Sequence, residues 1–229
     1  MSCFIKRPIA HRLEVMMDRN FYFKQLEIGP MENYVYLVGD KRRHECLAVD
    51  AAWDVRAILQ AAKSDGMKVV GGLLTHTHDD HCNAAETLVA ETGCKIYVHQ
   101  KEAGFLKGIE DHIEKVVDGS IITIGDFEIR VLHTPGHTPG SVCFLTEDYL
   151  FTGDTLFVGA CGRCDLEGGD AHQMYASLQK LAKLDDETMV LPGHAYGSTA
   201  TSTIKHEKRT NPYYQCGSLS EFIKDRVGG

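Results

Sequence analysis

Short stretches in which apolar and polar residues alternate recur along the chain and predict β-strands. The clearest is Phe21–Ile28, where aromatic and polar residues alternate, and glycine- or proline-containing turns separate many of the others. The predicted strands cover residues 21–28, 34–38, 45–50, 69–75, 95–99, 120–124, 127–133, 141–146, 149–152 and 188–191. This spacing is typical of a mixed α/β protein.

Segments with a helical spacing of apolar residues lie between these strands. One begins at Asp54, a favourable N-cap residue, and stops before Gly66, while Asp170 and Gln173 have the spacing of a capping box. The predicted helices cover residues 54–63, 84–91, 100–107, 170–184, 198–209 and 218–225. We expect two α/β halves that share one core: an N-terminal arm over residues 1–20, then a single catalytic domain over residues 21–229 with a short helical C-terminal tail.

Composition narrows the function classes. The 229 residues are 43% hydrophobic and 24% charged, which excludes a wholly disordered chain. A formal net charge of -8 argues against a nucleic-acid partner, and the absence of a run of about 18 apolar residues argues against a membrane span. The eight cysteines are scattered and no secretory signal is evident, so we expect reduced thiols and a cytoplasmic location.

The densest chemical signal is the pattern H-x-H-x-D-H, formed by His76, His78, Asp80 and His81 after a predicted buried strand. Imidazoles and carboxylates packed this closely would repel one another or stay unpaired unless a cation satisfies them. Imidazole and carboxylate suit Zn, Fe, Mn or Ni. The segment therefore predicts a metal site.

Six consecutive residues cannot enclose a metal, so further ligands must come from elsewhere in the chain. Three candidates follow predicted strands and lie among turn glycines: His137, Asp154 and His194. Loops at strand ends are where α/β folds commonly place their ligands. His133, four residues before His137, is expected to brace the same turn by hydrogen bonding.

With these motifs, the sequence resembles the metallo-β-lactamase superfamily, and within it the glyoxalase II (hydroxyacylglutathione hydrolase) branch. The motifs extend from Thr75 to Tyr196. The resemblance implies an α/β fold of the αββα sandwich type, with a metal site at one edge of two packed sheets. It assigns His76, His78 and His137 to one divalent metal ion, assigns Asp80, His81 and His194 to a second, and makes Asp154 the bridge between them.

The same resemblance implies a dinuclear metal-dependent hydrolase that cleaves a thioester such as S-lactoylglutathione, with Asp80 and Asp154 as catalytic residues. Zinc is the expected metal, with iron or manganese as alternatives. Two cations can generate a nucleophilic hydroxide near neutral pH, and a thiolate leaves without a general acid. The metal ligands alone would equally permit hydrolysis of a lactone or a phosphodiester.

The resemblance also implies a glutathione or other thiol conjugate as the small-molecule substrate. Arg163 falls where the family places a basic residue for the glycine carboxylate, and Tyr196 matches a tyrosine that contacts the same thiol. Asp165 departs from the pattern, since glutathione hydrolases usually have tyrosine there. The C-terminal tail is also shorter than a full glutathione-binding helical domain.

Three alternatives remain open at this point. Asp165 resembles the persulfide dioxygenase branch, in which His76, His137 and Asp154 would hold one Fe(II) that oxidises glutathione persulfide. A lactonase and a metal-binding module without turnover are the other two. Cys161 and Cys164 have the spacing of a redox or zinc pair, but no second such pair accompanies them in the sequence.

Overall fold

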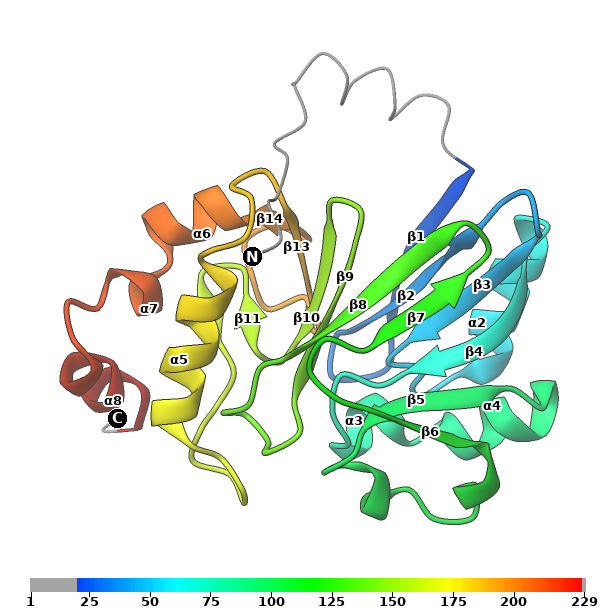
Figure 1. Ribbon diagram of the computed structural model, residues 1–229, viewed down its shortest axis with the longest axis horizontal. Coiled ribbons are helices and arrows are strands. Elements are labelled where there is room, and N and C mark those ends of the chain that lie inside the picture. Colours follow the sequence, from blue (N-terminus) through cyan, green and yellow to red (C-terminus); the bar gives the residue numbers. More distant parts are fainter. Residues whose placement is uncertain (1–19, 228–229) are drawn as a thin grey trace.

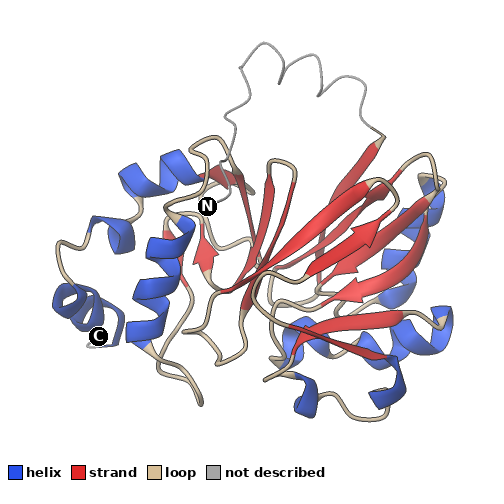
Figure 2. Ribbon diagram, in the orientation of Figure 1, coloured by secondary structure: helices blue, strands red, loops and turns tan. Residues whose placement is uncertain are grey.

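The computed structural model describes residues 20–227, so the predicted arm falls almost entirely outside the described residues. Two six-stranded sheets pack face to face, with helices on both outer sides (Figures 1 and 2). The predicted αββα sandwich is confirmed. No helix in the described part of the chain is long and apolar enough to cross a membrane.

The first sheet is built from the N-terminal half of the chain and is antiparallel at one edge and parallel over the rest. Its strands, in spatial order, are β1 (Phe21–Ile28), β2 (Asn33–Asp40), β3 (Glu45–Val49), β4 (Lys68–Leu73), β5 (Lys95–His99) and β6 (Ile113–Val116). Its outer face is covered by α2 (Val55–Ser64) and α4 (Ala85–Thr92). Between β4 and α4 lies the four-residue helix α3 (Asp79–Cys82).

The second sheet comes from the C-terminal half. In spatial order its strands are β14 (Ser202–Thr203), β13 (Met189–Pro192), β10 (Tyr149–Gly153), β9 (Val142–Thr146), β8 (Phe127–His133) and β7 (Ile121–Ile124). The helices of this half are α5 (Ala171–Leu181), α6 (Ile204–Thr210), α7 (Pro212–Gln215) and α8 (Leu219–Val227). A small hairpin of β11 (Leu156–Phe157) and β12 (Ala160–Cys161) follows β10.

Successive side chains of a strand point to opposite faces of its sheet, and this alternation explains how helices and sheets form layers. In β2, Val35 and Leu37 pack toward α2 and α4, while Tyr36 and Val38 pack toward the second sheet. An aromatic cluster joins the two sheets, with the Tyr36 and Phe151 ring centroids 5.1 Å apart. Full burial of each such side chain contributes about 1.5–3 kcal/mol of hydrophobic stabilisation. Period-two patterning is thus what gives each sheet two buried faces.

Two predicted helices differ from the structure, and one strand of the first sheet was missed. Residues 198–203 are turns and the short strand β14 rather than helix, because Thr203 caps α6 through its hydroxyl and pairs with Met189. Residues 100–107 contain only the 3-10 turn η1 (Ala103–Phe105), and a second turn, η2 (Glu110–His112), follows it. Edge strand β6 was not predicted because its two central residues, Glu114 and Lys115, are exposed and charged.

Candidate metal centre

The seven predicted ligands come together at one edge of the two sheets, where the strands that precede them end. His76 follows β4, His137 lies in the turn between β8 and β9, Asp154 follows β10 and His194 follows β13. Gly153 lets the sheets approach closely here: its φ is 47°, and a Cβ at this position would lie 2.3 Å from Thr75 Oγ1. The edge therefore gathers loops from both halves of the chain.

The imidazoles and Asp80 form two triads. In the first, His78 Nδ1 lies 3.1 Å from His76 Nε2 and 2.8 Å from His137 Nε2. In the second, His81 Nε2 and His194 Nε2 are 3.1 Å apart, and Asp80 Oδ2 lies 3.4 and 3.3 Å from them. In each triad the three candidate ligand atoms lie within 4.8 Å of one another, so each could hold a metal ion.

Asp154 lies between the two triads. Its Oδ2 is 3.5 Å from His137 Nε2 in the first triad, and its Oδ1 is 3.3 Å from His81 Nε2 in the second. Among the described residues, buried Oδ1 has no partner that meets hydrogen-bond geometry. A buried carboxylate oxygen without a hydrogen bond is costly, and a cation placed between the triads would satisfy it.

The outward-facing ring nitrogens of three of these histidines explain why a cation fits. Nδ1 of His137 donates to Arg163 O at 2.8 Å, Nδ1 of His194 to Met31 O at 2.9 Å, and Nδ1 of His81 to Asp50 Oδ2 at 3.0 Å. These acceptors hold a proton on Nδ1, so the inward-facing Nε2 atom of the neutral imidazole presents a lone pair. Converging lone pairs repel one another unless a metal ion accepts them.

Asp50, at the end of β3, supports two of these histidines and was missed in the sequence. Its Oδ2 accepts from His81 Nδ1 and, at 2.7 Å, from Thr75 Oγ1, and its Oδ1 accepts from Thr75 N at 2.8 Å. Thr75 Oγ1 in turn lies 3.1 Å from His76 Nδ1. An acidic residue at the end of a strand parallel to β4 was the available signal, because parallel strands end at the same edge.

Glu102 is a second missed residue, and it joins two ligand loops. Its buried carboxylate accepts from Thr77 N and Oγ1 in the segment that carries His76 to His81. It also accepts from Thr138 Oγ1 and Gly140 N, both at 2.8 Å, in the turn that carries His137. His133 also braces this turn, as expected, by donating from Nε2 to Pro139 O at 3.0 Å.

The two predicted substrate residues contact histidines of different triads. Arg163 contributes its carbonyl to His137, while its exposed guanidinium pairs with Asp165 through two bonds of 2.9 and 2.6 Å. Tyr196 stacks on His194, with ring centroids 4.4 Å apart and planes inclined by 9°. The Tyr196 side chain is half-exposed, so its ring is accessible from solvent.

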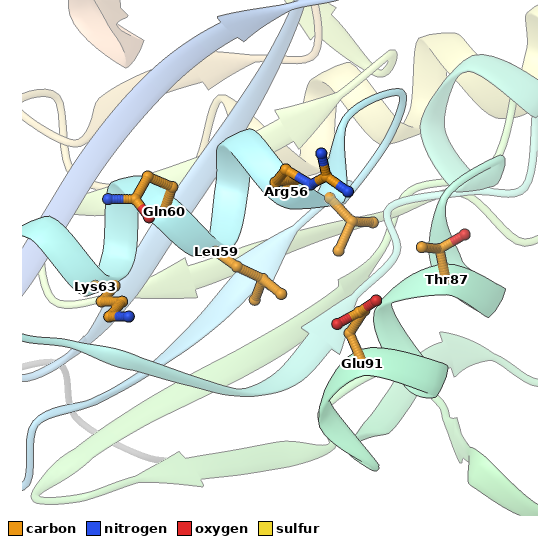
Figure 3. A pocket seen from close by; sticks show the side chains of 7 residues that line it. Arg56, Leu59, Gln60, Lys63, Thr87 and Glu91 are labelled. Carbon is orange, nitrogen blue, oxygen red and sulfur yellow. The ribbon is translucent and has the colours of Figure 1, made fainter.

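A hollow of about 310 Å³ lies elsewhere, on the outer face of the first sheet. Figure 3 shows that Arg56, Leu59 and Lys63 of α2 and Thr87 and Glu91 of α4 line it. None of the seven predicted ligands lines this hollow. It is therefore separate from the candidate metal centre.

The charges around His194 predict that metal binding depends on pH. Burial opposes the charge of His194, but Asp154 and Asp80 outweigh it and raise its pKa to about 9. A divalent cation must displace this proton below pH 9, so metal affinity should rise as much as about tenfold per pH unit between pH 7 and 9. Calorimetric titration with Zn²⁺ in buffers of different ionisation enthalpy measures the zinc affinity and the number of protons released on binding.

The exposed variant His206→Gln, on α6, is the matched control and should retain the full pH dependence. A zinc affinity that stays constant from pH 7 to 9, with no proton release, would contradict this account of the His194 charge.

Comparison with known proteins identifies the family. A model of the metallo-beta-lactamase superfamily matches residues 28–194. The chain is 33% identical to a probable polyketide biosynthesis zinc-dependent hydrolase, BaeB, of Bacillus velezensis, over 92% of this chain and 95% of that protein. It is 41% identical to the hydroxyacylglutathione hydrolase of Rhodospirillum rubrum, over 72% of this chain and 63% of that protein.

A solved structure gives the same result. The crystal structure of ETHE1 from Myxococcus xanthus is similar with a TM-score of 0.82 and 32% identity, over 91% of this chain and 92% of that one. Three observations support the same assignment: the αββα sandwich, the family match over most of the sequence, and these relatives. The chain belongs to the metallo-β-lactamase superfamily.

Proposed function

We propose that the protein is a dinuclear metal-dependent hydrolase that cleaves a thioester such as S-lactoylglutathione, with residues 21–229 acting as one catalytic domain. The observation that carries the proposal is the position of Asp154. Its two oxygens face two separate triads, and its buried Oδ1 has no hydrogen-bond partner in the described chain. One triad and one carboxylate would suffice for a single ion, whereas two triads around a shared carboxylate suit two.

In this proposal His76, His78 and His137 would hold the first ion, Asp80, His81 and His194 would hold the second, and Asp154 would be a ligand shared by both. Bound divalent cations would supply Lewis acidity and a water acidified toward neutral pH. Zinc is the first expectation because BaeB is named as zinc-dependent, and iron or manganese would suit the same ligands.

The chain's own groups would orient the reactants. Burial opposes ionisation of Asp80, but His194 and His81 lower its pKa to about 2, so Asp80 is a carboxylate at neutral pH. Together with Asp154 it can accept hydrogen bonds from a water and hold that water against the acyl carbon. The leaving thiol has a pKa near ~8.5 and departs as a thiolate, so the site needs no general acid for it.

The thiol part of the substrate is proposed to be glutathione or a similar conjugate, as the similarity to a hydroxyacylglutathione hydrolase suggests. Arg163 would bind its carboxylate. The exposed Arg163–Asp165 ion pair is weak enough to open for that exchange, because solvent screens exposed pairs. Tyr196, stacked on His194, would contact the bound conjugate.

A second candidate is oxidation of glutathione persulfide by one Fe(II) held by His76, His137 and Asp154. Asp165 favours it, because the resemblance to the persulfide dioxygenase branch rests on that position. The residues of the second triad would then only hydrogen-bond around the iron site. The buried Asp154 Oδ1, which faces His81 and His194, favours the hydrolase instead.

A side-by-side assay distinguishes the two candidates. Zinc-loaded and iron-loaded protein are each given S-lactoylglutathione and glutathione persulfide, and thiol release and oxygen uptake are recorded. We expect release of glutathione from the thioester and no oxygen uptake with the persulfide. Oxygen uptake by the iron-loaded sample, without thioester cleavage, would overturn the proposed hydrolase.

A further inference from the structure

Three large apolar side chains are exposed around the second triad. Met31 in the β1–β2 turn is 45% exposed, Trp53 after β3 is 36% exposed, and Tyr196 after β13 is 54% exposed. They come from three separate loops, and each is connected to residues of the second triad. We call these three residues the apolar wall.

Trp53 is held in place by several contacts. Its φ of 63° is unusual for a bulky residue and strains the backbone. Its backbone N–H donates to Asn83 Oδ1 and its indole N–H to Asn33 Oδ1, both at 2.8 Å. Gly29 makes room for the ring, since a Cβ there would lie 2.3 Å from Trp53 Cδ1. The fold thus fixes a partly exposed tryptophan in a strained conformation.

The same contacts connect the apolar wall to the candidate ligands. The Asn33 amide that accepts from Trp53 also donates to Asp80 O and Oδ2, both at 3.0 Å. Met31 O accepts from His194 Nδ1, and the Tyr196 ring stacks on the His194 ring. A substrate bound at the second triad would therefore lie next to the apolar wall.

The chemistry of the two sides of the centre differs. On the first-triad side, Arg163 and Asp165 form an exposed ion pair. On the second-triad side, the exposed groups of the apolar wall are a thioether, an indole and a phenol ring. Exposed apolar surface beside convergent polar groups is typical of a ligand site, and such a surface binds aliphatic chains rather than anions.

We propose that the apolar wall binds the acyl half of the substrate, and that the protein prefers thioesters with an aliphatic acyl chain of several carbons over short polar acyl groups. This inference rests on the proposed thioesterase function and refines its substrate: S-lactoylglutathione, whose acyl group is short and polar, would be cleaved with a lower kcat/KM than a thioester with a longer aliphatic chain. Tyr196, stacked on His194, would contact both the thiol half and the acyl half of the thioester. Each methylene that is buried against the wall should raise kcat/KM by about fourfold, until the chain extends past the wall.

A series of acyl thioesters tests the proposal. The zinc-loaded protein, its Met31→Ala variant and the control Phe105→Ala are assayed with acetyl, butyryl, hexanoyl and octanoyl thioesters of N-acetylcysteamine, an uncharged thiol. Phe105 is 70% exposed and lies on η1, outside the wall, so its variant should behave as the parent. In Met31→Ala, the octanoyl-to-acetyl ratio of kcat/KM should fall severalfold.

Trp53 supplies a second readout that needs no catalysis, because it is the single tryptophan of the sequence. The S-octyl thioether of N-acetylcysteamine cannot be hydrolysed and should shift the tryptophan emission to the blue in a saturable way. The S-ethyl thioether at the same concentration should not. Met31→Ala should weaken the octyl response, and Phe105→Ala should leave it unchanged.

The two readouts separate this inference from the proposed function. Binding of the octyl thioether at Trp53 without cleavage of any thioester would support the apolar wall and overturn the hydrolase. Cleavage of all four thioesters at equal kcat/KM, with no change in tryptophan emission, would support the hydrolase and overturn the apolar wall.

Discussion

Asp154→Asn is expected to lose at least one bound metal ion and to lower kcat/KM for thioester hydrolysis more than about 100-fold. Substitution of a residue behind a metal ligand already costs 10–100-fold, and Asp154 faces both triads directly. Asparagine keeps the size of the side chain but replaces one carboxylate oxygen with an amide NH₂ group, which cannot serve as a metal ligand. Elemental analysis and steady-state kinetics on the purified variant measure both effects.

Asp79→Asn is the matched control for this substitution. Asp79 lies in the same ligand segment, next to Asp80, but its side chain is exposed on α3. Its variant should keep the metal content and kinetics of the parent protein. An Asp154→Asn variant that retains both its metal and its activity would refute the assignment of Asp154 as the shared ligand.

Asp50→Asn is expected to weaken metal binding about 10–100-fold. Asp50 has a φ of 50°, a conformation that asparagine tolerates, so the backbone should not change. The amide cannot accept from Thr75 N, Thr75 Oγ1 and His81 Nδ1 together, so one buried donor loses its partner and the orientation of His81 is released. Competition with a chromogenic zinc chelator gives the affinity.

The control for Asp50 is Asp54→Asn. Asp54 caps α2 by accepting from Ala57 N, and asparagine caps helices equally well, so zinc affinity and thermal stability should stay unchanged. If Asp50→Asn also bound zinc with the affinity of the parent, the support that Asp50 gives to His81 would have no bearing on the metal.

Much of the fold could be predicted because strand patterning is local. The predicted bounds of Phe21–Ile28 and Phe127–His133 are those of β1 and β8, where alternation is clear. Asp170 caps α5 as predicted, although Gln173 donates to the Asp170 carboxylate and the Asp170 N–H instead donates to Gly136 O. Predictions failed where tertiary pairing decided the structure, as for β6 and β14.

The candidate ligands could be found for a different reason. His76, His78, Asp80 and His81 are close in sequence, and the remaining three follow strands that end at the same edge. Asp50 and Asn33 were missed because their partners are distant: Asp50 binds His81, 31 residues away, and Asn33 binds Asp80, 47 residues away. Such hydrogen bonds depend on the packing of whole elements, which single-chain patterns do not encode. The metal roles of the seven residues stay predictions.

The central claim, a centre for two metal ions shared by Asp154, is tested most directly by elemental analysis of protein purified without added metal. Samples of the parent protein and of Asp154→Asn are compared at known protein concentration. We expect about two divalent metal ions per parent chain, and fewer in the variant. One iron per parent chain, with no second ion after dialysis against zinc, would contradict the claim.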